Sequence, residues 1–380
     1  SVWATIYIVN LPEIGGLDAL LTHENVSNKL SILPDFSDSK AVITLLIIPF
    51  AVQWWSTWYP GAEPGGGGYI AQRMLAAKDE KHATWATLFF NFAHYALRPW
   101  PWIIVGLASL VIFPNIESIN TTFPNLSENM QGHDVAYAAM MTYLPAGLIG
   151  IVLTSLIAAF MSTISTQLNW GSSYIVNDFY ARFLKPNSSE KEKVFVGRIS
   201  TVVLMIFAGI LSKYLSDAQE VFQLLLQIGA GTGLLFILRW FWDRINPYSE
   251  IAAMLISFII AFVFFVNGKL DTPLFQLEGH WQLITGVVVT TLGWVIVTLF
   301  TQPTNKETLT KFNALIFDSE SKFHNINYKI LAFILGVVGT YSFLFSTGYF
   351  IYGKTILATG LAVLTIMCGL LLIKNWKKIS

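Results

Sequence analysis

The chain has 380 residues, of which 54% are hydrophobic and 12% are Asp, Glu, Lys or Arg, whereas soluble domains carry about 25% charged residues. Its formal net charge is zero, so nothing in the composition points to nucleic acid as a partner. The single cysteine, Cys368, excludes a disulfide framework and a cysteine metal site. The composition predicts an all-helical protein that crosses a lipid bilayer several times.

Apolar stretches that approach the roughly 20 residues needed to cross a bilayer recur along the chain. The first residues, SVWATIYIVN, have no Met and no charged leader, so we interpret the chain as the C-terminal part of a longer protein. We predict a single transmembrane domain over 1–380 with about ten spans, counting a truncated first one. These spans are roughly 1–10, 41–77, 82–114, 145–180, 195–213, 219–242, 249–267, 281–301, 328–350 and 354–374.

The second predicted span is interrupted at 60–68 by PGAEPGGGG, a sequence that cannot continue a helix. Irregular backbone at membrane depth is tolerated where it lines a cavity, and a discontinuous helix is a pointer to a transporter's binding site. A plain loop between a span and a surface helix would give the same pattern.

The third predicted span contains Arg98 well inside apolar sequence. A charge in this position faces a cavity in many membrane proteins, because exposure to lipid is costly. An arginine that extends to the interface is the other interpretation, and the neighbouring Trp100 and Trp102 would suit it.

The fourth predicted span is rich in hydroxyl side chains and carries no charge before Asp178. On a helix, the carbonyl of Ala159 lies beneath the side chains of Ser162 and Thr163, so three neutral oxygens converge. Such oxygens suit a hard cation such as sodium. On the residues alone, ordinary hydrogen bonding of Ser and Thr to the preceding turn is the simpler interpretation.

Basic residues gather in alternate loops, which sets the predicted orientation in the membrane. They follow the second, fourth and sixth predicted spans, recur in 303–327 and close the chain, whereas the loop 115–133 has none. The positive-inside rule therefore predicts a multi-pass protein of the cell membrane with a cytoplasmic C-terminus.

Three segments together resemble the sodium:solute symporter family, the family of the sodium/glucose and sodium/proline cotransporters. They are YIAQRMLAAKDEKHA at 69–83, AAFMSTISTQLNWGSSYIVNDFY at 158–180 and QIGAGTGLLFILRWFWDRINPYSE at 227–250. The resemblance implies a LeuT-type fold of two inverted repeats, incomplete here at the N-terminus, and sodium-driven import of a small organic solute by alternating access. Because one repeat is largely missing, we do not expect this chain alone to transport.

The resemblance also implies roles for individual residues. Ala159, Ser162 and Thr163 match the helix that supplies sodium ligands in this family, which favours the sodium interpretation. The implied substrate-binding residues are Gln227, Trp54, Trp55, Tyr95 and Arg98. Arg98 would suit an anionic solute better than a neutral sugar, so sugar specificity is not carried over. An interhelical hydrogen bond is the alternative role for Gln227.

Two classes of function remain open after the resemblance. One is a sodium-coupled secondary transporter, and the other is a membrane sensor or receptor that keeps the transporter fold without transport. An integral membrane enzyme is disfavoured, because the predicted spans show no nucleophile with a base, no metal cluster and no paired carboxylates.

Overall fold

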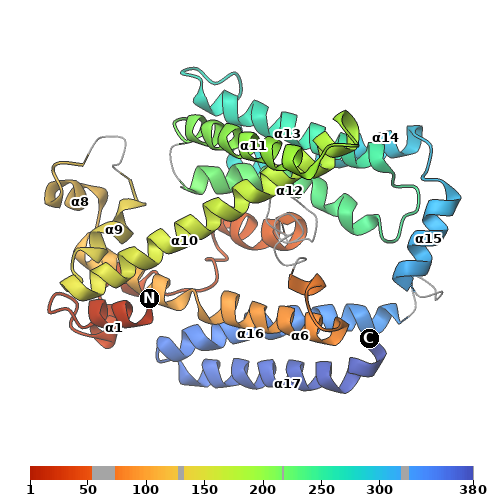
Figure 1. Cartoon of the computed structure of the whole chain (residues 1–380). Coiled ribbons are helices and arrows are strands. Elements are labelled where there is room, and N and C mark those ends of the chain that lie inside the picture. The colour runs from red at the N-terminus through yellow and green to blue at the C-terminus, as the bar shows by residue number, and fades with distance from the viewer. Residues whose placement is uncertain (54–72, 127–131, 216–217, 318–324, 380) are drawn as a thin grey trace. The chain divides into compact units, whose positions relative to one another are not determined.

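The structure is a computed structural model that describes residues 1–53, 73–126, 132–215, 218–317 and 325–379. The described residues form helices joined by turns and loops (Figure 1). They divide into two compact units, one made of 1–29 and 101–220 and the other of 30–100 and 221–380.

The first unit is built around one long helix and the next long helix along the chain, which packs against it. Its elements are α1 (Val2–Val9), α2 (Leu17–Thr22), α3 (Glu24–Ser27), α7 (Trp100–Ile112), α8 (Ile116–Thr122), α9 (Val135–Met141), α10 (Ala146–Ser173), the π-helical η5 (Tyr174–Leu184) and α11 (Glu190–Leu211). The α10 helix is the long ribbon coloured yellow to light green in Figure 1. It passes without a break into η5, so the predicted fourth span is one continuous helical rod.

The turn from η5 into α11 is held by polar contacts around Glu192. Its carboxylate accepts hydrogen bonds from the Tyr180 hydroxyl at 2.6 Å and the Lys185 ammonium at 2.7 Å. The side chain of Ser189 caps α11 by accepting from the Glu192 N–H at 3.3 Å. These contacts fix the return of the chain, so that α10 and α11 pack against each other as a hairpin.

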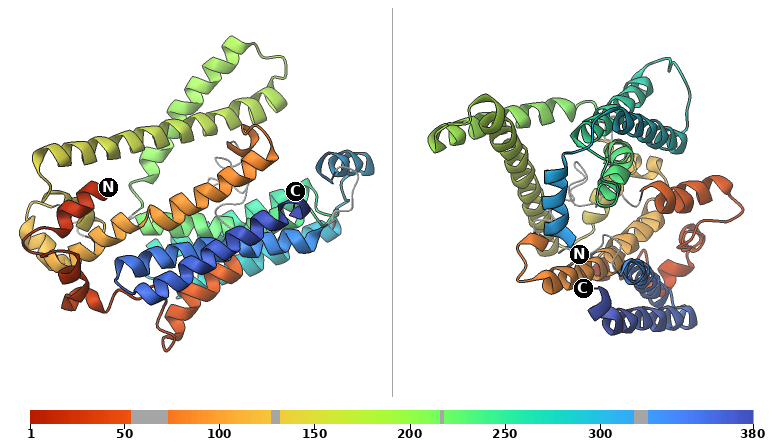
Figure 2. Two further views of the ribbon diagram at one scale, coloured as in Figure 1. Left: turned by 90° about the horizontal axis from the view of Figure 1, so that it is seen from below. Right: turned by 90° about the vertical axis from the view of Figure 1, so that its right-hand side faces the viewer.

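The second unit contains the other helices of the described residues. They are α4 (Ser39–Val42), the π-helical turns η1 (Ile43–Ile47) and η2 (Pro49–Gln53), α6 (Glu80–Asn91), the π-helical η3 (Phe92–Leu97), α12 (Ala218–Leu238), α13 (Pro247–Lys269), α14 (Gly279–Phe300), α15 (Lys306–Phe317), α16 (Ile326–Ile351) and α17 (Thr355–Ile379). Figure 2 shows α16 and α17, in blue, side by side along their length.

Seven stretches of the described chain are long and apolar enough to cross a membrane. They are Glu80–Ile112, Ala146–Leu184, Glu190–Leu211, Pro247–Lys269, Gly279–Phe300, Ile326–Ile351 and Thr355–Trp376. Two shorter apolar helices cover Ser39–Ala51 and Leu224–Leu238. The chain is therefore a polytopic membrane protein, while the larger predicted number of spans stays a prediction.

A tryptophan centres the packing of α12, α13 and α14. Trp294 of α14 is 1% exposed and packs with apolar residues of the other two helices and of the turn between them, namely Leu235, Phe236, Ile245 and Ala253. A buried hydrogen bond between the Thr298 and Ser249 hydroxyls, at 2.7 Å, also joins α14 to α13.

Gly231 lets α12 approach its neighbours closely. A Cβ atom at this position would lie 2.8 Å from Thr290 Oγ1 and 2.9 Å from Ser257 Oγ. Both side chains are buried, and Ser257 donates a 2.6 Å hydrogen bond to the Ile228 carbonyl. Neither neighbour can therefore move away without disturbing the packing of the three helices.

We expect Gly231→Ala to destabilise the protein, because overpacking a filled core costs roughly 1–3 kcal/mol. The measurement is the thermal unfolding midpoint of the purified full-length protein in detergent. Gly286→Ala on α14 is the matched control, since its new Cβ would meet only Ile260, at 3.8 Å. Equal midpoints for the two variants would contradict the tight contact at Gly231.

Candidate functional site

The predicted sodium ligands lie on α10, in the first unit. Ala159, Ser162 and Thr163 fall within this continuous 28-residue helix, so their spacing places them on one face, and all three are exposed. The hydroxyl of Thr166 donates to the Ser162 carbonyl at 2.8 Å. In the described part of the chain, the hydroxyls of Ser162 and Thr163 make no hydrogen bond of this kind. Bonding to the preceding turn thus occurs at Thr166, and both predicted ligand hydroxyls remain available.

Two of the predicted substrate residues, Tyr95 and Arg98, lie in the second unit. Tyr95 is part of η3, and Arg98 directly follows it. The guanidinium of Arg98 lies 2.8 Å from His94 Nδ1. Because a guanidinium can only donate, His94 accepts through an unprotonated nitrogen. The His94 ring stacks on Phe90 with a centroid distance of 4.8 Å and lies nearly perpendicular to the Tyr95 ring, also with a centroid distance of 4.8 Å.

The backbone at this cluster has π-helical geometry. The N–H of Arg98 donates to the carbonyl of Ala93, five residues earlier, at 3.1 Å. Short π-helical turns are frequent at functional sites, because the wider turn re-aims side chains. The Arg98 side chain is exposed.

We expect Arg98→Lys in the full-length protein to weaken uptake of an anionic solute, because an ammonium cannot reproduce a bidentate contact. Loss of one charged hydrogen bond corresponds to a rise of roughly tenfold in half-saturating concentration. The measurement is uptake against solute concentration. Arg182→Lys, an exposed arginine of η5, is the matched control. If both variants behave like the wild type, Arg98 has only an interfacial role.

Gln227 of α12 contacts another glutamine. Its Nε2 donates to Gln282 Oε1 of α14 at 3.3 Å, and Gln282 Nε2 donates to the Leu277 carbonyl at 2.7 Å. The interhelical hydrogen bond that was the alternative role for Gln227 is therefore present, and the substrate contact stays a prediction. Trp54, Trp55 and the interruption at 60–68 lie outside the described residues.

Sequence reasoning missed two partners of the predicted residues. His94 precedes Arg98 by four residues, a spacing at which helical side chains meet, so a signal for this pair existed. Gln282 is 55 residues from Gln227, and no local pattern connects them.

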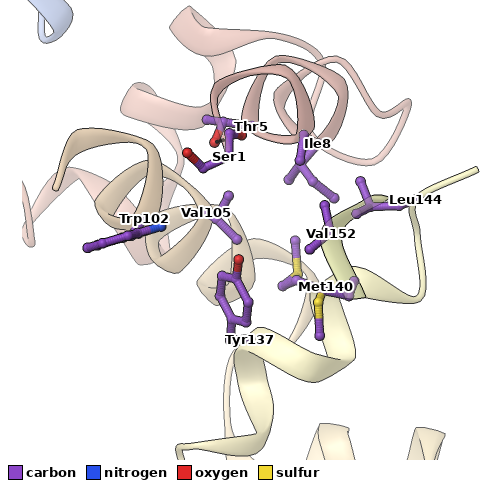
Figure 3. A pocket seen from close by; sticks show the side chains of 11 residues that line it. Ser1, Thr5, Ile8, Trp102, Val105, Tyr137, Met140, Leu144 and Val152 are labelled. Atoms are coloured by element: carbon purple, nitrogen blue, oxygen red, sulfur yellow. Dashed lines mark hydrogen bonds between the residues drawn. The ribbon is translucent and has the colours of Figure 1, made fainter. Parts of the chain in front are cut away.

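A small cavity lies elsewhere in the first unit (Figure 3). It has a volume of about 20 Å³, room for about one water molecule. Its walls come from four helices and include Thr5 of α1, Val105 of α7, Tyr137 of α9 and Val152 of α10. Among the predicted site residues that the structure describes, none lines it.

A model of the sodium:solute symporter family matches residues 3–257, which include all the predicted site residues. The chain belongs to the sodium:solute symporter family.

Individual relatives are similar over part of their length. The sodium/proline symporter of Haemophilus influenzae is 31% identical over 168 residues, which are 43% of this chain and 32% of that protein. The sodium/glucose cotransporter of Vibrio parahaemolyticus is 27% identical over 233 residues, 59% of this chain and 42% of that protein. The sodium/myo-inositol cotransporter 2 of Oryctolagus cuniculus is 26% identical over 264 residues, 63% and 38% respectively. The chain thus spans about a third to two fifths of the relatives that it matches.

Proposed function

We propose that the protein is a sodium-coupled symporter that imports a small polar organic solute by alternating access, and that it is not an enzyme. The family match over residues 3–257 carries the proposal. The relatives are named as symporters of sodium with proline, glucose or myo-inositol, which supports a small polar solute as the cargo. No observation favours a sensor without transport.

Sodium is the proposed coupling ion, with Ala159, Ser162 and Thr163 as its ligands on α10. The two hydroxyls that are not hydrogen-bonded within the described chain support this role. Neutral oxygens hold a monovalent cation weakly enough to release it in each cycle. Gln227, Tyr95 and Arg98 in the second unit, with Trp54 and Trp55, are the proposed solute contacts.

The membrane arrangement belongs to the same proposal. We propose a LeuT-type fold of inverted repeats in the cell membrane, with the C-terminus in the cytoplasm. Lysines at positions 374, 377 and 378 support this orientation through the positive-inside rule.

The test is a solute screen on the full-length protein in proteoliposomes, with sodium or potassium outside. Proline, glucose and myo-inositol are the first probes, followed by small anionic solutes. We expect uptake of at least one probe to require sodium. Uptake that is equal in potassium for every probe, or no uptake of any, would overturn the proposal.

A further inference from the structure

The amide orientation of Gln227 follows from a short chain of hydrogen bonds. The Leu277 carbonyl can only accept, so the group of Gln282 that lies 2.7 Å from it is the amide NH₂. The other end of the Gln282 amide, its Oε1, therefore points to Gln227. Since that oxygen also only accepts, Gln227 must present its own NH₂, at 3.3 Å.

In this arrangement, the side-chain carbonyl oxygen of Gln227 takes no part in the hydrogen bond to Gln282. It lies at the opposite end of the amide from Gln282, and within the described residues no hydrogen bond reaches it. Gln227 is only half-buried, so its amide is not sealed inside the protein. A polar oxygen in this position in a membrane protein gains most from a partner that donates a hydrogen bond.

The backbone beneath Gln227 is also held in place. The Ser257 hydroxyl of α13 lies 3.3 Å from the Gln227 carbonyl and 2.6 Å from that of Ile228. One turn later, Gly231 brings α12 against α13 and α14. With backbone and side chain both held, the amide cannot adapt freely, and a fixed group discriminates between ligands more strongly than a mobile one.

We infer that Gln282 is a positioning residue that holds the Gln227 amide with its oxygen toward the solute, so that the solute group bound there is a hydrogen-bond donor, a hydroxyl or an ammonium. The inference rests on the proposed function. It narrows the solute class, because a group that cannot donate a hydrogen bond at this position, such as an ether or a quaternary ammonium, is rejected.

The test compares pairs of probes that differ in donors. Proline is paired with N,N-dimethylproline, and myo-inositol with its monomethyl ethers. Sodium-dependent uptake of each donor-bearing probe, and its inhibition by the methylated partner, are measured on the full-length protein. We expect the wild type to prefer the donor-bearing member of at least one pair by about tenfold or more.

Variants at Gln282 then separate positioning from packing. Gln282→Met removes both hydrogen bonds of Gln282 while keeping a side chain of similar length. The Gln227 amide can then rotate, so we expect the preference for the donor-bearing probe to fall several-fold. Gln282→Glu keeps an acceptor facing Gln227 but loses the donor to the Leu277 carbonyl, so we expect it to retain only part of the preference. Thr290→Val is the control, because this buried hydroxyl of α14 has no hydrogen-bond partner among the described residues. If Gln282→Met does not fold, Gln282→Leu tests the loss of the same two hydrogen bonds.

The outcomes separate the two claims. A wild type without sodium-dependent uptake overturns the proposed function, and the inference with it. A wild type that transports in a sodium-dependent manner, but whose preference is absent or unchanged by Gln282→Met, overturns the inference alone.

Discussion

Replacing Ser162 or Thr163 by alanine in the full-length protein should raise the sodium concentration for half-maximal uptake by roughly tenfold, since a hydrogen bond or ligand contact to a charged group contributes about 1.5–3 kcal/mol. At the proposed site, each substitution removes one of the neutral oxygens that α10 would supply to the sodium ion. The nearest acidic residue along this helical rod is Asp178, which lies several turns away. The measurement is initial uptake against sodium at saturating solute.

Three control variants show whether the effect belongs to those two hydroxyls. Thr163→Ser keeps the oxygen and should be mild. Thr166→Ala removes a hydroxyl already bonded to the Ser162 carbonyl, so sodium dependence should change little. Ser172→Ala breaks a 2.9 Å hydrogen bond to Gly197 of α11 and should lower stability without changing sodium affinity. If the alanine variants at 162 and 163 match the wild type, the ion binds elsewhere.

Gln227→Ala in the full-length protein should weaken solute binding far more than sodium binding. The substitution removes the proposed solute contact and leaves the Gln282 oxygen without its donor, a loss of about 1–3 kcal/mol. We expect the half-saturating solute concentration to rise by roughly tenfold or more, with sodium dependence nearly unchanged. The measurement is uptake as a function of each concentration in turn.

The same experiment distinguishes a purely structural role for Gln227. If its only task is to join α12 to α14, the alanine variant should lose solute and sodium affinity together, or should unfold at a lower temperature without any selective effect. Gln282→Ala breaks the same interhelical bond and serves as the matched variant. A selective loss of solute affinity that is larger in Gln227→Ala than in Gln282→Ala supports direct contact.

Composition and apolar run length were sufficient to predict a polytopic helical membrane protein. The helix α14, for example, covers Gly279–Phe300 where an apolar run at 281–301 predicted a span. Hydropathy did not reveal the π-helical turns at 92–97 and 174–184. A stretch that is apolar throughout has the same hydropathy profile whether its backbone is α-helical or π-helical. The family could be predicted from three segments, since their polar and glycine residues are distinctive as well as their hydropathy.

The candidate site was predicted less completely, for a physical reason. Residues four apart on one helix meet by geometry, so the pair of His94 and Arg98 could have been foreseen. The bond between Gln227 and Gln282 depends on how α12 and α14 pack, which no local sequence pattern encodes. For Trp54 and Trp55, which lie outside the described residues, the sequence resemblance remains the only basis.

The central claim is that sodium entry drives solute accumulation. One charge crossing the membrane contributes about 2.3 kcal/mol per 100 mV, so even a single coupled ion can concentrate a solute.

The most direct measurement uses the full-length protein in proteoliposomes with a transported solute at equal concentration on both sides, zero membrane potential and an imposed inward sodium gradient. With one coupled ion, a gradient of about tenfold should drive solute accumulation of about tenfold, since both correspond to about 1.4 kcal/mol. A sodium ionophore should abolish the accumulation. A solute level that stays equal on both sides, with the gradient intact, would contradict sodium coupling.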